Sequence, residues 1–130
     1  MSSKTRRTIG LVLAVLNLLL LGASAADKII GSQHALTMSG SFGLTPDVYR
    51  TLGIIELTSA VLFVIPRTAT IGLLLLASYM GGAIATHLQH HEPIGFPVGI
   101  EVFIWIIAVL RLPEVTSRFF GKSTDPSFVP

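Results

Sequence analysis

One carboxylate, Glu56, limits most strongly what this chain can do. It lies within residues 48–65, a helix-length segment that is otherwise almost entirely uncharged and too apolar to face water. We therefore expect its side chain to be buried. If the segment crosses a bilayer, an ionisable group near mid-depth costs at least about 2.5 kcal/mol to insert, and such groups usually mark functional sites.

Two more polar residues fall at a similar depth when each apolar segment is counted inward. At 1.5 Å per residue, Asn17 and Tyr79 both lie about 12–14 Å from the outer ends of their segments, as Glu56 does. This spacing predicts a polar pocket in which Glu56 binds a lipophilic ligand or relays a proton for it. Alternatively, a protonated Glu56 hydrogen-bonds Asn17 or Tyr79 and only fixes the register of the helices.

A second polar layer is expected nearer the outer face, with a route for protons from water through His87 and Glu101 to Glu56. Its other candidate members are Asp27 and Lys28, for which ordinary anchoring at the interface is the simpler interpretation. Glu101 lies about one turn inside its segment and needs a partner. Lys28 and His87 are the nearest candidates.

Trp105 lies deeper than the interfacial belt where membrane tryptophans gather, so we expect it to face a partner helix or a ligand. His87 and His91 have a spacing that could hold a divalent metal together with Glu101. Histidines clustered in an outer loop are more often solvated, however, and we predict no metal site. The chain also lacks phosphate-loop, zinc-protease and nucleophile-elbow motifs, so no catalytic residue is assigned.

The composition indicates a membrane protein. The 130 residues are 51% hydrophobic and 12% charged, whereas soluble domains carry about 25% charged residues. A hydrocarbon core of about 30 Å takes roughly 20 apolar residues to cross. Four segments approach this length, residues 8–30, 47–65, 68–88 and 95–112, the last being marginal. The predicted fold is all-α, a transmembrane antiparallel four-helix bundle that forms one domain.

Local signals mark the ends of these segments. Thr45, Pro46 and Asp47 are typical of a helix start. The link at residues 66–68 is so short that the second and third segments should form an antiparallel hairpin. Small residues at four-residue spacing, Ala77 and Gly81 among them, predict close helix packing that makes the third segment central. Residues 32–44 are expected to be a loop, residues 113–120 an interfacial helix, and residues 121–130 a disordered cytoplasmic tail.

Charge and cysteine content exclude several classes of protein. The chain has no cysteine, which removes disulfides, thiolate metal sites and thiol redox chemistry. The basic residues are not interleaved with stacking aromatics, so nucleic acid is not an expected partner. Instead, most basic residues flank one side of the predicted spans, and the positive-inside rule places both termini in the cytoplasm. These residues are Lys4, Arg6, Arg7, Arg67, Arg111, Arg118 and Lys122.

The first segment also has the pattern of a signal peptide. A basic start, an apolar run at residues 11–21 and the small residues Ala23, Ser24 and Ala25 are consistent with a cleaved leader. Cleavage would leave three spans and an outside amino terminus. We favour an uncleaved first span.

Three stretches of the chain resemble the DoxX-like family of small four-helix membrane proteins. They are Leu-Gly-Ile-Ile-Glu-Leu at 52–57, Ile-Pro-Arg-Thr-Ala at 65–69 and Tyr-Met-Gly-Gly-Ala-Ile-Ala-Thr-His-Leu at 79–88. The family takes its name from a subunit of a thiosulfate:quinone oxidoreductase. The resemblance implies a bundle in the bacterial inner membrane, and a quinone as a possible ligand.

The leading hypothesis is a non-catalytic subunit that holds a quinone or another small lipophilic molecule within a membrane redox complex. Two alternatives stay open: a structural anchor for soluble enzymes, and a small proton-coupled transporter that works as a homo-oligomer. The residues expected to line the ligand site are Glu56, Tyr79, Asn17, His87, Glu101 and Trp105.

Overall fold

The computed structural model describes residues 1–121, and every regular element among them is a helix. The elements are α1 (Ser3–Ile30), α2 (Gln33–Ser41), α3 (Pro46–Val64), α4 (Ala69–Gln89), α5 (Gly95–Arg111) and α6 (Pro113–Phe120). The predicted all-α class is confirmed. The tail predicted to be disordered lies, apart from Gly121, outside the described residues.

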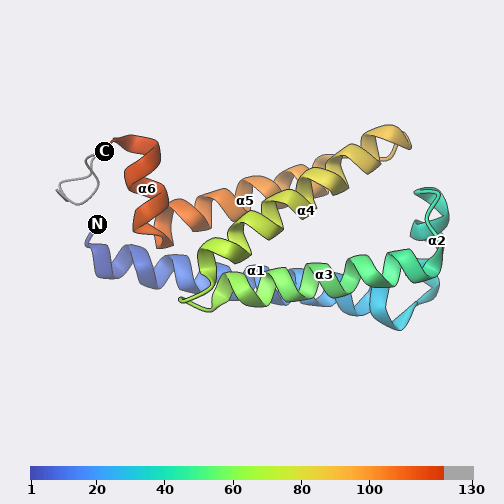
Figure 1. Cartoon of the computed structure of the whole chain (residues 1–130), viewed down its shortest axis with the longest axis horizontal. Coiled ribbons are helices and arrows are strands. Elements are labelled where there is room, and N and C mark those ends of the chain that lie inside the picture. The colour runs from blue at the N-terminus through green and yellow to red at the C-terminus, as the bar shows by residue number, and fades with distance from the viewer. Residues whose placement is uncertain (122–130) are drawn as a thin grey trace.

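The four long helices α1, α3, α4 and α5 pack in a ring. α1 contacts α3 and α5, and α4 contacts the same two helices. Successive long helices run in opposite directions (Figure 1). Within residues 1–121, α1 and α4 share no close backbone contact, so α4 is not the central helix that its small residues predicted. The pair α1 and α3 diverges from the pair α4 and α5 toward the end where α2 lies (Figure 1).

The start of α3 follows the predicted signals. Thr45 caps the helix, its side-chain oxygen accepting a hydrogen bond from the backbone nitrogen of Val48 at 3.3 Å. Pro46 occupies the first turn, where its missing N–H costs nothing, and Asp47 lies where the helix dipole favours a negative charge.

The segment expected to be a loop contains a helix instead. Gly31, at φ 73°, ends α1 in the left-handed conformation. Ser32 then accepts a hydrogen bond from the backbone nitrogen of Ala35 at 3.0 Å and starts α2. The glycine and polar residues of this segment obscured the capping serine, and the prediction of a loop from 32 to 44 was wrong.

The C-terminal turn of α3 has all of its carbonyls satisfied. Helix ends leave the last four carbonyls without partners inside the helix. Val61 accepts from the nitrogen of Ile65 at 3.3 Å, and Leu62 accepts from the hydroxyl of Thr68 at 2.8 Å. The remaining two, Phe63 and Val64, both accept from the guanidinium of Arg111 at the end of α5. The basic residue at position 111 therefore joins two helices.

The core occupies the end of the molecule near α6, where the helices converge. Its fully buried large side chains come from α1, α3, α4 and α5: Leu21, Phe63, Leu76, Ile104 and Ile107. Two glycines permit the closest helix contacts. A Cβ on Gly72 would lie 2.2 Å from the backbone nitrogen of Phe63, and one on Gly10 would lie 2.8 Å from Cβ of Arg111.

The small-residue stripe of α4 does not make such contacts. Nothing lies within 4 Å of a Cβ built on Gly81 or on Gly82. The prediction that this stripe brings helix backbones together within the chain was wrong, because the buried face of α4 runs from Ala69 to Met80 and does not include the two glycines.

The outer surface is apolar over most of the helix lengths. Leu19 is 65% exposed, Leu74 59% and Val102 54%, a pattern that suits lipid and not water. By length and apolar composition, α1 and α4 could each cross a membrane, and α5 with α6, bent by 98°, count as a third candidate. α3 is not among the candidates. It carries Asp47, Arg50 and Glu56.

The contact between α3 and α4 can be tested at Gly72. We expect Gly72→Ala to lower the free energy of unfolding by about 1–3 kcal/mol, because the added methyl group would push the two backbones apart. Gly81→Ala is the matched control and should be neutral or stabilising, since its Cβ meets open space and alanine favours helix. Reversible unfolding in mixed detergent micelles measures both. Equal stabilities would contradict the packing described here.

Candidate functional site

A cavity of about 390 Å³ lies where the helix pairs diverge. Its lining comes from α1, α2, α3, α4 and the start of α5, and the volume falls in the range of pockets for small ligands. Most of the lining is apolar. The apolar side chains are Met38, Phe42, Leu44, Leu52, Met80, Ala83, Phe96 and Pro97.

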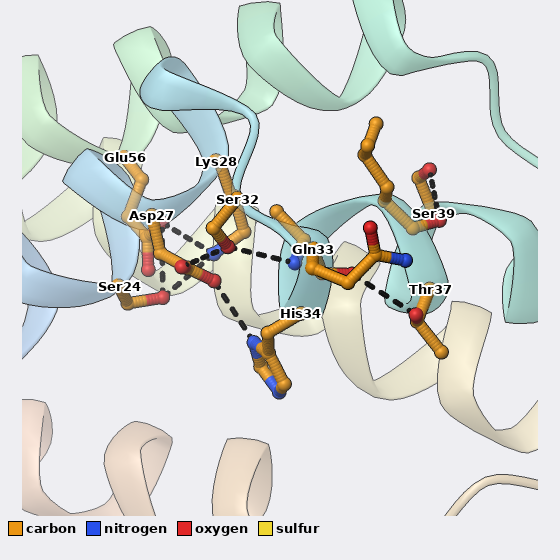
Figure 2. A network of polar contacts seen from close by, with 11 residues as sticks. Ser24, Asp27, Lys28, Ser32, Gln33, His34, Thr37, Ser39 and Glu56 are labelled. Atoms are coloured by element: carbon orange, nitrogen blue, oxygen red, sulfur yellow. Dashed lines mark hydrogen bonds and ion pairs between the residues drawn. The ribbon is translucent and has the colours of Figure 1, made fainter.

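Four polar residues meet on one side of this cavity, and we call them the Glu56 cluster: Ser24, Lys28, Glu56 and Tyr79. The ammonium of Lys28 lies 2.8 Å from Oε2 of Glu56 and donates to Oγ of Ser24 at 2.6 Å. The hydroxyls of Ser24 and Tyr79 both reach the same Oε2 at 3.5 Å. Figure 2 shows Ser24 and Lys28 converging on Glu56.

The sequence positions this cluster through helix spacing and one glycine. Ser24 and Lys28 are four residues apart on α1, so they share one helix face. Gly53 lies one turn before Glu56 on α3, and a Cβ there would come within 2.8 Å of Cβ of Lys28. The missing side chain lets α3 approach α1 closely enough for the ion pair to form.

The ion pair is buried, since the side chains of Lys28 and Glu56 are 12% and 3% exposed. Two opposite charges at hydrogen-bond distance compensate each other, whereas either one alone would be an unpaired charge in an apolar setting. Glu56 thus acts as a charged acceptor. The alternative interpretation of the sequence had a protonated Glu56 instead, because it assigned Lys28 to the interface and gave Glu56 no cation.

Three predicted site residues line the cavity, namely Glu56, Tyr79 and His87. Tyr79 donates to Glu56, one of the two expected contacts. Nδ1 of His87 lies 2.6 Å from the carbonyl oxygen of Ala83, one turn earlier on α4. The His87 ring packs on Phe42, with the ring centroids 4.6 Å apart, so it closes the cavity together with the segment between α2 and α3.

Asn17 lies elsewhere. It is fully buried in the core, about 10 Å further along α1 from Ser24. Neither of its amide atoms has a hydrogen-bond partner among the described residues, so the expected bond between Asn17 and Glu56 is absent. The depth count was made from residue 26, just before the charged Asp27 and Lys28, and not from the end of the 8–30 segment. The register of α1 against α3 instead makes Glu56 face Ser24.

Glu101 and Trp105 form a separate pair on α5. The indole nitrogen of Trp105 donates to Oε1 of Glu101 at 2.9 Å. With Phe119, whose ring centroid is 5.6 Å from that of Trp105, they line a shallow groove distinct from the cavity. The expected partners of Glu101, Lys28 and His87, were wrong: Trp105, one turn along the same helix, donates to Oε1, and Oε2 is buried without a partner among the described residues.

The residues expected to form a second polar layer lie in separate contacts. Asp27 accepts from Ser32 and lies 2.9 Å from Nδ1 of His34, a set of contacts at the end of α1 (Figure 2). Lys28, one residue further, points instead to Glu56. Within residues 1–121, no three His, Asp or Glu side chains gather closely enough to hold a metal.

Sequence reasoning missed Ser24, Tyr49 and the contribution of α2, and it treated Lys28 as an anchor. Nζ of Lys28 also lies 5.5 Å from the centroid of the Tyr49 ring, a cation–π arrangement. The sequence did contain one signal that sets Lys28 apart from the other basic residues. Lys28 stands on the side of the spans where basic residues are scarce, and a serine one turn earlier shares its helix face.

The comparisons with known proteins establish the family. Residues 12–110 match the model of the DoxX-like family, which covers more than half of the chain, and the chain belongs to that family. The resemblance seen in the sequence is confirmed. No curated protein and no solved structure matches. Together with the apolar helices, the family identifies an integral membrane protein.

The ion pair makes a testable prediction about stability. We expect Lys28→Met to lower the free energy of unfolding by about 3–5 kcal/mol, because it leaves the Glu56 carboxylate buried without its cation. Adding Glu56→Leu to that variant should recover most of the loss, since a buried pair replaced by apolar residues is often neutral or stabilising. Lys4→Met, at the exposed start of α1, is the control.

Equilibrium unfolding in detergent gives the stabilities of the wild type, of these three variants and of Glu56→Leu alone. If the two substitutions at the pair destabilise additively, Lys28 and Glu56 do not compensate each other and the described contact is absent.

Proposed function

We propose that this DoxX-like membrane protein binds a small lipophilic ligand in the cavity beside Glu56. The observation that carries the proposal is the combination of an apolar cavity of about 390 Å³ with a buried ion pair at its wall. Ligand sites are typically apolar hollows with a few placed polar groups. The cavity fits this description.

The energetic cost of the Glu56 cluster supports a function beyond folding. Apolar side chains in place of a buried ion pair would often stabilise a protein as well or better. The pair joins α1 and α3 at the edge of a cavity. A role in ligand binding therefore explains its presence better than a contribution to stability does.

We further propose that all four long helices cross the bilayer as an antiparallel bundle. α5 has 17 residues, or about 26 Å of helix at 1.5 Å per residue, close to the thickness of the hydrocarbon core. In α3 the Lys28 ion pair compensates Glu56, while Asp47 and Arg50 lie within the first turns. The basic residues Lys4, Arg7 and Arg67 favour a cytoplasmic position for the α6 end and both termini.

A quinone or its reduced form is a suitable ligand in this setting. Aromatic side chains on three elements, Phe42, Tyr49, Tyr79 and Phe96, line the cavity and can pack on a ring. The role that follows is that of a holding subunit in a membrane redox complex, with electrons exchanged by a partner. The family resemblance supports this part of the proposal.

Two neighbouring glycines allow a direct test. Gly82 lines the cavity and Gly81 does not, and a Cβ at either position meets no atom within 4 Å. We expect Gly82→Leu to weaken binding of decylubiquinone, oxidised or reduced, at least tenfold, because the new side chain occupies ligand space. Gly81→Leu should bind as the wild type does.

Isothermal titration calorimetry on protein in lipid nanodiscs measures the affinities. An affinity that Gly82→Leu leaves unchanged would place the ligand outside the cavity and overturn the proposed site.

A further inference from the structure

We propose that the ligand of this cavity is a neutral hydrogen-bond donor, a lipophilic molecule with a phenol-type hydroxyl that binds Oε1 of Glu56. This inference rests on the proposed function and specifies its ligand. It favours a hydroquinone or another phenol over a quinone, whose carbonyl groups only accept hydrogen bonds.

The first step concerns the two oxygens of Glu56. Every donor that reaches this carboxylate within residues 1–121 goes to Oε2: Lys28 at 2.8 Å, and Ser24 and Tyr79 at 3.5 Å. Oε1 receives none, although the residue is only 2% exposed and lines the cavity. Oε1 is therefore the oxygen of this carboxylate that is left open to a donor in the cavity, and a ligand hydroxyl would make a charge-assisted hydrogen bond there.

The second step concerns the donors of the cluster, which are already occupied. The Lys28 ammonium has three N–H groups. One lies toward Ser24 and one toward Glu56, and the ammonium also sits near the face of the Tyr49 ring. The Tyr79 hydroxyl donates to Glu56. A ligand carbonyl would therefore have to displace a contact of Lys28 or Tyr79, or turn to the hydroxyl of Tyr49, whereas a ligand hydroxyl can bond Oε1 of Glu56 directly.

The third step concerns charge. Lys28 and Glu56 together carry no net charge, and their separation of 2.8 Å leaves no room for a second cation between them. An amine in its charged form would meet the Lys28 ammonium at close range, where like charges repel strongly in an apolar setting. A neutral donor avoids this repulsion, which favours a hydroxyl over an ammonium group.

His87, which also lines the cavity, presents a second acceptor. Nδ1 of His87 lies 2.6 Å from the carbonyl oxygen of Ala83. Since a carbonyl only accepts, Nδ1 is assigned the proton, and in this tautomer Nε2 is an acceptor. Oε1 of Glu56 and Nε2 of His87 can thus both receive a donor from the ligand.

A matched pair of probes tests the inference without redox chemistry. Nonylphenol and its methyl ether, nonylanisole, have nearly the same shape and apolar tail, but only the phenol donates a hydrogen bond. We expect wild-type protein in nanodiscs to bind the phenol at least tenfold more tightly than the ether, after subtraction of uptake by empty nanodiscs. Glu56→Gln should reduce this ratio to near one, since the amide that replaces the carboxylate is a weaker, uncharged acceptor.

Glu101→Gln is the matched variant. It makes the same change from carboxylate to amide in the separate groove on α5, outside the cavity, so the preference for the phenol should persist. The wild-type ratio alone decides the matter if Glu56→Gln fails to fold.

The outcomes separate this inference from the proposed function. If phenol and ether bind equally well and Gly82→Leu weakens both, the cavity holds lipophilic ligands and the donor requirement is wrong. If neither probe binds saturably, or if Gly82→Leu weakens neither, the cavity is not the ligand site and both proposals fall together.

Discussion

The ion pair between Lys28 and Glu56 is the constraint that the two charges impose on the packing of α1 and α3, since neither charge can be buried without the other. It allows a helix with a mid-length carboxylate to pack among apolar helices, because the charge is compensated at 2.8 Å by a neighbour. The pair also sets the register of α1 against α3. Gly53 lies against Lys28 only in this register, and the same register places Glu56 at the cavity wall.

The two ends of the molecule are packed differently. Near α6, backbones touch at Gly10 and Gly72, and large side chains such as Phe63 and Leu76 fill the interior. Toward α2 the helices diverge, and the interior becomes a cavity with a polar wall. Rigid packing at one end supports the Glu56 cluster at the other, as a binding site requires of its scaffold.

The sequence predicted the helical class, the burial of Glu56 and its contact with Tyr79, because a carboxylate in an apolar segment has few other options. It failed where the answer depends on which helix faces which. Asn17 was placed beside Glu56 by a depth count that lacked the register of α1 and α3. The stripe with Gly81 and Gly82 predicted backbone contact, but a spacing of small residues does not say whether a helix, a cavity or lipid lies opposite. The sequence assigned Lys28 to anchoring at the interface or to Glu101. Only the close packing of α3 on α1 at Gly53 brings it to Glu56 instead.

The bonds from Arg111 to the end of α3 bear on how the chain assembles during synthesis. The carbonyls of Phe63 and Val64 receive their donor from a residue 48 and 47 positions later in the chain. Until α5 has been synthesised, those two groups stay without that partner, and an unpaired carbonyl withdrawn from water is costly. The last long helix therefore completes the end of the third, and a chain cut short before residue 111 would leave both carbonyls without the donor that they have in the full protein.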